Sequence, residues 1–136
     1  MRSIETITLE DAKRVLAAGE EEAENQGSPS NIAVVDAGAI LVAHVRQDGA
    51  WIGSVNIAIN KAFTARAFNI STKDLADNSK PGQQFYGIQQ SNDGRIIIFA
   101  GGIPLTSGDF IVGAVGVSGG TGDQDQAVAK AAAAAL

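Results

Sequence analysis

The sequence predicts an α+β fold in which an antiparallel sheet of about five strands carries helices on both of its faces. Apolar runs bounded by turn residues alternate with helical patterns along the chain. The strand runs are apolar at almost every position, which indicates that both faces of the sheet are covered. Hydrophobic residues make up 45% of the 136 residues, but aromatic residues only 5%. We therefore expect a core of small aliphatic side chains and one domain spanning residues 1–136.

The first half of the chain predicts a helix, a hairpin and a second helix. Thr8 is a good N-cap residue, and the apolar pattern that follows it stops at Gly27-Ser28-Pro29. Residues 32–36 and 40–46 are apolar runs separated by turn residues, which predicts an antiparallel pair of strands. Residues 54–69 have apolar side chains at steps of three and four, which is typical of a helix.

The second half predicts a long loop, more strands and a final helix. Residues 71–94 lack periodicity and contain several turn residues, so we expect a loop that serves a ligand or an interaction. Residues 95–100 and 110–118 are predicted strands, with a short extended piece at 103–105 between them. A helix is expected from Gly122 to the end of the chain.

Composition argues against several classes of protein. The chain has no cysteine, which excludes disulfides, thiolate metal sites and a cysteine nucleophile. The net charge of −5 argues against nucleic acid as a partner, because phosphate binding needs clustered Lys and Arg. No segment approaches the run of about 20 apolar residues that crosses a membrane. We expect a cytoplasmic protein with no membrane partner.

Lys61 is the most unusual charge, because it lies among small residues inside the second predicted helix. A buried ammonium group is costly unless it is paired, and desolvation lowers its pKa. Arg46, Asp36 and Asp48 are the charges expected nearest to it if the hairpin packs on this helix. The functional alternative is an anion-binding or acid–base site. The structural alternative is an ion pair that closes a strand-to-helix junction.

Three further features are candidates for ligand contact, each with a plainer alternative. Arg66 is suited to bind a carboxylate from solvent, or simply to form a surface salt bridge. Phe85 and Tyr86 are adjacent aromatics in the long loop, suited to stack on a planar ligand or to hold the loop against a neighbouring subunit. The bare backbone of Gly101-Gly102 would let a ligand approach closely, although glycines in turns need no ligand.

The single histidine, His44, lies in the middle of a predicted strand. We expect it to be a packed, hydrogen-bonded residue rather than a metal ligand. Because no second histidine exists to activate Ser118, serine hydrolysis is not indicated. The glycine pairs lack the spacing of a phosphate-binding loop, so a nucleotide site is not indicated either.

Five short segments, in this order, carry a resemblance to a known family: Val34–Gly38, Arg46–Ala50, Lys61–Ala65, Gly101–Leu105 and Gly113–Gly120. With Asp125 they resemble the GlcG/HbpS-like family, from about residue 30 to residue 136. That family includes haem-binding proteins and the C-terminal domain of some corrinoid adenosyltransferases. The resemblance implies a profilin-like fold, assembly into homo-oligomers from dimers to octamers, and a small-molecule pocket that takes haem.

Our leading hypothesis is a small-molecule-binding protein of this family that binds haem or a related tetrapyrrole. One alternative is a cofactor-free enzyme or accessory protein of small-acid catabolism that uses Lys61 and an Asp. Another is a structural oligomer with an incidental pocket. The small-residue face of residues 127–136 also predicts a homo-oligomer. The expected ligand-binding residues are Arg46, Asp48, Lys61, Arg66, Phe85, Tyr86, Gly101 and Gly102.

If haem binds, the sequence offers its iron few ligands. Iron in haem proteins is usually held by His, Cys, Met or Tyr. This chain supplies one His, one Tyr and only the initiator Met. Only His44 and Tyr86 have a conventional claim on iron, so we expect weak binding or unusual ligation.

Overall fold

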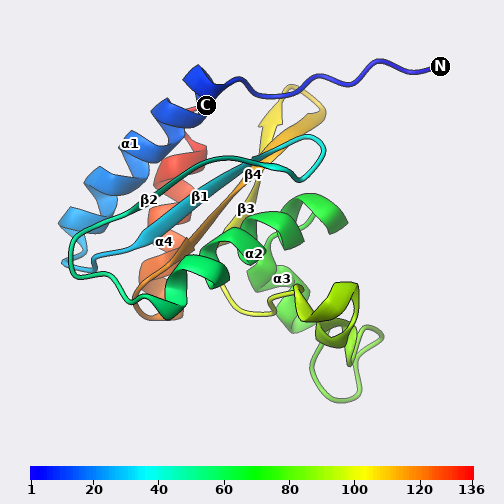
Figure 1. The fold of residues 1–136 in the computed structure, drawn as a ribbon. Helices are drawn as coiled ribbons and strands as arrows, with labels where there is room; N and C mark the ends of the chain where they lie inside the picture. The colour runs from blue at the N-terminus through cyan, green and yellow to red at the C-terminus, as the bar shows by residue number, and fades with distance from the viewer.

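The computed structural model describes all residues from Met1 to Leu136 and places one sheet between helices (Figure 1). Helices α1 (Leu9–Asn25) and α4 (Gly122–Ala133) cover one face of the sheet. Helix α2 (Gly53–Phe68) covers the other face, and the short α3 (Thr72–Asp77) follows it. The prediction of helices on both faces is confirmed.

The sheet has four antiparallel strands in the order β2-β1-β4-β3. Their bounds are β1 Asn31–Asp36, β2 Leu41–Arg46, β3 Gly102–Ser107 and β4 Phe110–Ser118. Strand β1 pairs with β2 and β4, so Asn31 lies between Arg46 and Ser118. The predicted hairpin of residues 32–36 and 40–46 is confirmed, with a bulge between Val34 and Val35.

Two hydrophobic clusters fill the two faces of the sheet, and both are built from small residues. The cluster under α1 and α4 has 14 buried residues, mostly Val, Ala, Ile and Leu. The cluster under α2 has six buried residues, of which five are alanine and the largest is Val35. They are Ala33, Val35, Ala58, Ala62, Ala65 and Ala114. The expected core of small aliphatic side chains is therefore confirmed, and it lets α2 lie very close to the sheet.

The prediction of a strand at residues 95–100 is wrong. This segment has no sheet partner; Ile96 is buried and the Ile97 amide donates to the Thr64 hydroxyl of α2 at 3.0 Å. The third strand begins at Gly102 and forms a hairpin with β4, with Gly108 in the left-handed conformation at the turn. The sheet thus has four strands rather than about five, because the apolar run before Gly101 is used to cover one side of α2.

The chain between α2 and β3 is also more ordered than the predicted loop of residues 71–94. Ser71 caps α3 by accepting a hydrogen bond from the Asp74 amide, and Leu75 of this helix is buried. Two short 3₁₀ turns, Ile88–Gln90 and Asn92–Gly94, follow. Figure 1 shows that this region extends away from the sheet beyond α3.

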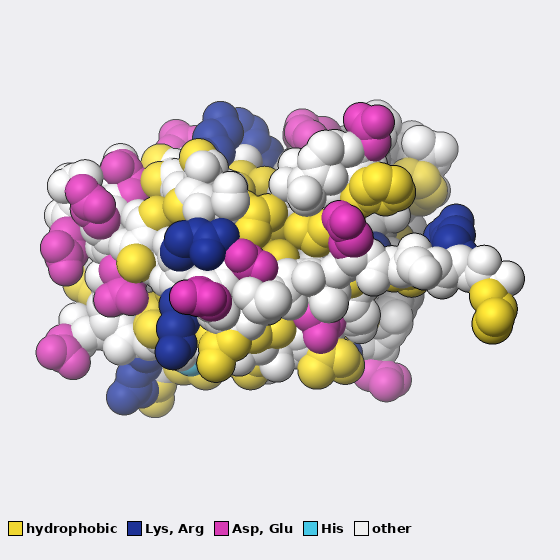
Figure 2. Space-filling model, turned by 90° about the horizontal axis from the view of Figure 1, so that it is seen from above, with side chains coloured by type: hydrophobic (Ala, Val, Ile, Leu, Met, Phe, Trp, Pro, Cys, Tyr) yellow, Lys and Arg dark blue, Asp and Glu magenta, His cyan; other side chains and the backbone are white.

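The end of the molecule that carries the N-terminal segment and the two hairpin turns is shown in Figure 2. Lys and Arg side chains are scattered there among acidic and hydrophobic ones. Ile4, Ile40 and Phe110 are exposed apolar residues of these segments. None of the helices has the length and apolar character required to span a bilayer.

We predict that Gly116→Ala strongly destabilises the fold. A methyl group at Gly116 of β4 would overlap the Ala58 carbonyl oxygen and lie 2.5 Å from the Ala62 amide nitrogen, both in the backbone of α2. Because backbone atoms cannot move aside as a side chain can, we expect a loss of at least about 2 kcal/mol in the free energy of unfolding. Urea unfolding would measure it.

Gly53→Ala is the matched control, because a methyl group at the start of α2 meets nothing within 4 Å. We expect it to leave the unfolding midpoint unchanged or slightly raised. Equal stability of the two variants would contradict the close contact between α2 and β4.

Candidate functional site

A buried ion pair joins the two helical layers at the end of the sheet. Lys61 comes from the middle of α2 and Asp125 from the first turn of α4, and their Nζ and Oδ2 atoms are 3.1 Å apart. The exposed fractions of the two side chains are 0% and 4%. Lys61 Nζ also donates to the Val117 carbonyl oxygen near the end of β4, at 2.7 Å.

The remaining groups around the pair complete its environment. Asp125 Oδ1 accepts a hydrogen bond from the Gly120 amide at 3.0 Å. The Phe99 ring lies 4.8 Å from Lys61 Nζ, so it meets the cation as an aromatic face. Burial lowers the pKa of Lys61 and raises the pKa of Asp125, while the attraction between the two charges opposes both shifts. The site is an enclosed pair whose charges satisfy each other.

Gly101 and Gly102 lie against Lys61 of this pair, but they leave no opening for a ligand. Gly101 has φ +123°, and a methyl group there would lie 2.9 Å from Lys61 Nζ. A methyl group at Gly102 would lie 2.6 Å from both the Lys61 carbonyl oxygen and Thr72 Cγ2. Both glycines are therefore explained by close packing around the buried lysine.

The charges expected near Lys61 are not its partners. Asp36 caps its own turn by accepting hydrogen bonds from the Gly38 and Ile40 amides, while Arg46 and Asp48 line a cavity at the far edge of the sheet. The partner is Asp125, which is 64 residues away in sequence. In the sequence, Asp125 is recognisable only as an acidic residue in the first turn of a capped helix. Acidic residues are common there because they interact favourably with the helix dipole, so this position does not identify Asp125 as the partner of Lys61.

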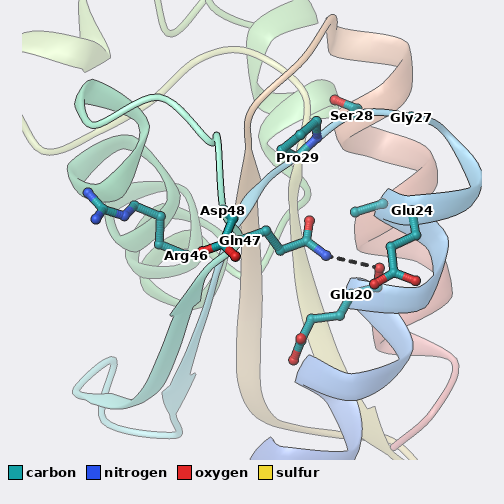
Figure 3. A pocket seen from close by; sticks show the side chains of 9 residues that line it. Glu20, Glu24, Gly27, Ser28, Pro29, Arg46, Gln47 and Asp48 are labelled. Carbon is teal, nitrogen blue, oxygen red and sulfur yellow. Dashed lines mark hydrogen bonds between the residues drawn. The ribbon is translucent and has the colours of Figure 1, made fainter.

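Arg46 and Asp48 line a cavity of about 530 Å³ between β2 and the C-terminal end of α1 (Figure 3). Glu20 and Glu24 of α1 face it, so its charged side chains are mainly acidic. Gln47 connects its walls: its Nε2 donates to the Glu20 carbonyl at 3.2 Å, and its Oε1 accepts from the Ser30 amide at 3.0 Å. Figure 3 shows the Arg46 side chain directed away from the two glutamates.

The other predicted residues lie elsewhere and do not join either group. Arg66 Nη1 donates to Asn69 Oδ1 at 2.7 Å, across the C-terminal end of α2. Phe85 and Tyr86 lie in the region beyond α3, with exposed fractions of 44% and 66%. The structure thus divides the predicted set into an enclosed group, an acidic cavity, the end of α2 and an exposed aromatic pair.

His44 is half-buried on β2, and its hydrogen bond defines its tautomer. Asn31 Nδ2 donates to the Trp51 carbonyl at 3.0 Å, so the Asn31 Oδ1 atom faces His44 Nε2 at 3.2 Å. Because an amide oxygen only accepts, we assign the proton of the neutral ring to Nε2. Burial, aided by the Arg46 charge, lowers the pKa of His44. The nitrogen that most often binds haem iron is therefore engaged within the chain.

Comparisons with known proteins place this geometry among related chains. The family described as haem-degrading, HbpS-like proteins matches residues 7–134. An uncharacterised protein from the dhaT-dhaS intergenic region of Citrobacter freundii is 40% identical, over 96% of this chain and 92% of its own length.

Solved structures show the same fold. Protein ORFY of Klebsiella pneumoniae is similar with a TM-score of 0.95 and 39% identity, covering 100% of this chain and 96% of its own. A structure of PduOC in complex with haem is similar with a TM-score of 0.92 and 30% identity, covering 96% of this chain and 95% of its own.

We predict that Lys61→Met destabilises the fold, although Met keeps much of the length of the side chain. The substitution leaves Asp125 buried without its counter-charge, which we expect to cost about 3–5 kcal/mol in the free energy of unfolding. Asp125→Asn should be similarly costly, because it strands the Lys61 ammonium.

The double variant is the control, measured by urea unfolding of all four proteins. Combining Lys61→Met with Asp125→Asn should cost clearly less than the sum of the two single changes, because no isolated charge remains. Additive losses would show that the two groups do not interact as a pair.

Proposed function

This chain belongs to the family of haem-degrading, HbpS-like proteins, and we propose that it is a small-molecule-binding protein that takes haem or a related tetrapyrrole. The observation that carries the proposal is its likeness, over nearly the whole chain, to a structure described as a haem complex. The family description points to the same ligand class. Bound haem would supply an iron centre with redox and oxygen chemistry, while the chain's own residues would bind and orient it.

Tyr86 fits the iron best among the side chains present. Tyr86 is 66% exposed, and Tyr oxygen is a known haem ligand. His44 is half-buried with Nε2 bonded to Asn31, so its use would require that bond to break. Phe85 stands next to Tyr86 and would cover part of the flat ring.

The interior offers no room for a tetrapyrrole. Backbone atoms of α2 and β4 lie in contact at Gly116, and the other face of the sheet is filled by the 14-residue cluster. The cavity at Arg46 and Asp48 has one hydrophobic residue among its nine, whereas ligand sites for apolar rings are mostly apolar. We therefore propose an open, surface-bound haem with modest affinity.

The catalytic alternative loses its main support, because Lys61 is fully enclosed and paired with Asp125. A group that a substrate cannot reach is poorly placed for proton transfer. Nothing else in the structure favours small-acid catalysis over ligand binding.

We also propose that the chain forms a homo-oligomer, through a different surface from the one expected. The small-residue face of α4 is used within the chain, since Val128, Ala129 and Ala132 are fully buried against α1 and the sheet. The side of α2 that faces away from the sheet instead carries exposed apolar residues at both ends of the helix, with Asn56 and Asn60 between them. The exposed apolar residues are Ile52, which immediately precedes the helix, and Phe68 at its last position, with the partly exposed Ile59 and Phe63 between them.

We predict that Tyr86→Phe shifts the absorbance spectrum of the haem complex more than His44→Gln does. Phe keeps the ring but removes the phenol oxygen, while His44 is held by Asn31. Haem titration of the purified protein, followed by its absorbance, measures both affinity and ligation.

Each variant is first checked for folding by circular dichroism. Absence of saturable haem binding by the wild type would overturn the proposed function. If His44→Gln had the larger effect, the iron would instead bind at β2, and a six-coordinate spectrum surviving both changes would exclude both residues as ligands.

We predict that Ile52→Glu shifts the protein toward the monomer in light scattering, because it places a charge at an exposed apolar position immediately before α2. Ile40→Glu is the matched control, since Ile40 is similarly exposed at 67% but lies in the β1–β2 turn. A wild-type monomer at micromolar concentration would contradict the oligomer, and equal effects of both changes would contradict the assignment to α2.

A further inference from the structure

Another cavity adjoins the acidic one, shares Gly27, Ser28 and Pro29 with it, and lies between the N-terminal end of α4 and the turn that follows α1. Its volume is about 380 Å³, within the range of roughly 300–1,000 Å³ typical of small-molecule sites. None of its nine lining residues is charged. The walls are glycine backbone and the side chains of Ser28, Trp51, Thr121 and Gln124, so polar groups meet one large aromatic ring.

The Ser28 hydroxyl is the group that points to a ligand. Ser28 is only 5% exposed. Its amide donates to the Ala23 carbonyl and its carbonyl accepts from the Ser30 hydroxyl, but its own hydroxyl has no partner within the chain. It lies against Gly120, and Figure 3 shows it turned away from Glu20 and Glu24. Ser28 is almost fully buried, but its hydroxyl is not committed to a hydrogen bond within the chain, so it is free to bond a ligand in the cavity that it lines.

The other side chains of the cavity also keep free hydrogen-bonding groups. Gln124 Oε1 accepts from the Thr121 amide, which leaves the Nε2 hydrogens available. Thr121 Oγ1 accepts from the Gln124 amide, which leaves its hydroxyl hydrogen available. The backbone of Trp51 is held by Asn31, while its side chain is 64% exposed and offers both a flat face and an N–H donor.

We propose that this cavity binds a small neutral polyol. Hydroxyl groups both donate and accept, so they match the free hydroxyls of Ser28 and Thr121 and the donors of Gln124 and Trp51. The carbon side of such a ligand would lie on the indole face. This site is separate from the aromatic pair at which we place haem, so the two proposals can fail independently.

An anionic ligand is the main rival, because the N-terminus of α4 favours negative charge. The surroundings argue against it. The cavity contains no Lys or Arg, Asp123 lies in the first turn of α4, and the adjoining cavity contains Glu20 and Glu24. The whole chain carries a net charge of −5. A neutral ligand avoids this repulsion while using the same hydrogen-bond donors.

The test uses the fluorescence of Trp51, which is the only tryptophan of the chain and lines this cavity. The full chain is titrated with erythritol, with butan-1-ol as an apolar match of the same carbon number, and with sodium acetate as an anion. We expect a saturable change in emission with erythritol only. No saturable change, an equal response to butan-1-ol, or a response to acetate alone would overturn the proposal.

Ser28→Ala is the deciding variant, since it removes the unpartnered hydroxyl without breaking any hydrogen bond of the fold. We expect erythritol affinity to fall about five-fold while the unfolding midpoint stays the same or rises. Ser107→Ala, an exposed serine of β3, and Tyr86→Phe, at the proposed haem site, should both leave erythritol binding unchanged. Unchanged erythritol affinity in Ser28→Ala would also overturn the proposal.

Discussion

The buried pair of Lys61 and Asp125 is the interaction on which the relative placement of the two helical layers depends. Helices α2 and α4 lie on opposite faces of the sheet, so the two side chains meet only at the end of β4, where the Val117 carbonyl accepts a further hydrogen bond. An isolated charge at this depth would cost far more than the pair gains. A shift of either helix along the sheet would separate the two charges and leave each of them buried without a partner. Gly101 and Gly102 have no side chains, so they leave space for the pair.

Close packing on both faces decides where a ligand can bind. The cluster under α2 consists of alanines and one valine, and at Gly116 the helix backbone touches the strand backbone. Such an interface leaves no internal chamber between helix and sheet. Binding is then left to the outer face of α2, the region beyond α3 and the surface cavities at the ends of α1 and α4. A flat apolar ligand and a small polar one would accordingly use different parts of the surface.

Local patterns predicted the elements well, and long-range partners poorly. The three long helices, the first hairpin and the coverage of both sheet faces follow from periodicity and turn residues, which are local properties, whereas α3 fell within the predicted loop of residues 71–94. The apolar run of residues 95–100 looked like a strand, but apolar character does not say whether a segment pairs with a strand or lies against a helix, as this one does where the Ile97 amide donates to Thr64 of α2. Lys61 was recognisable as unusual, yet its partner Asp125 lies 64 residues away and only the folded topology brings them together.

The ion pair also connects the stability of the fold with its binding surface. Asp125 uses one carboxylate oxygen for Lys61 and the other for the Gly120 amide, and Gly120 is part of the wall of the uncharged cavity. The same turn places Gly120 against the Ser28 hydroxyl. The position of that wall therefore depends on a charge held by a helix on the opposite face of the sheet. Any change that loosens the pair, even one buried far from solvent, should alter the shape of the cavity before it unfolds the chain.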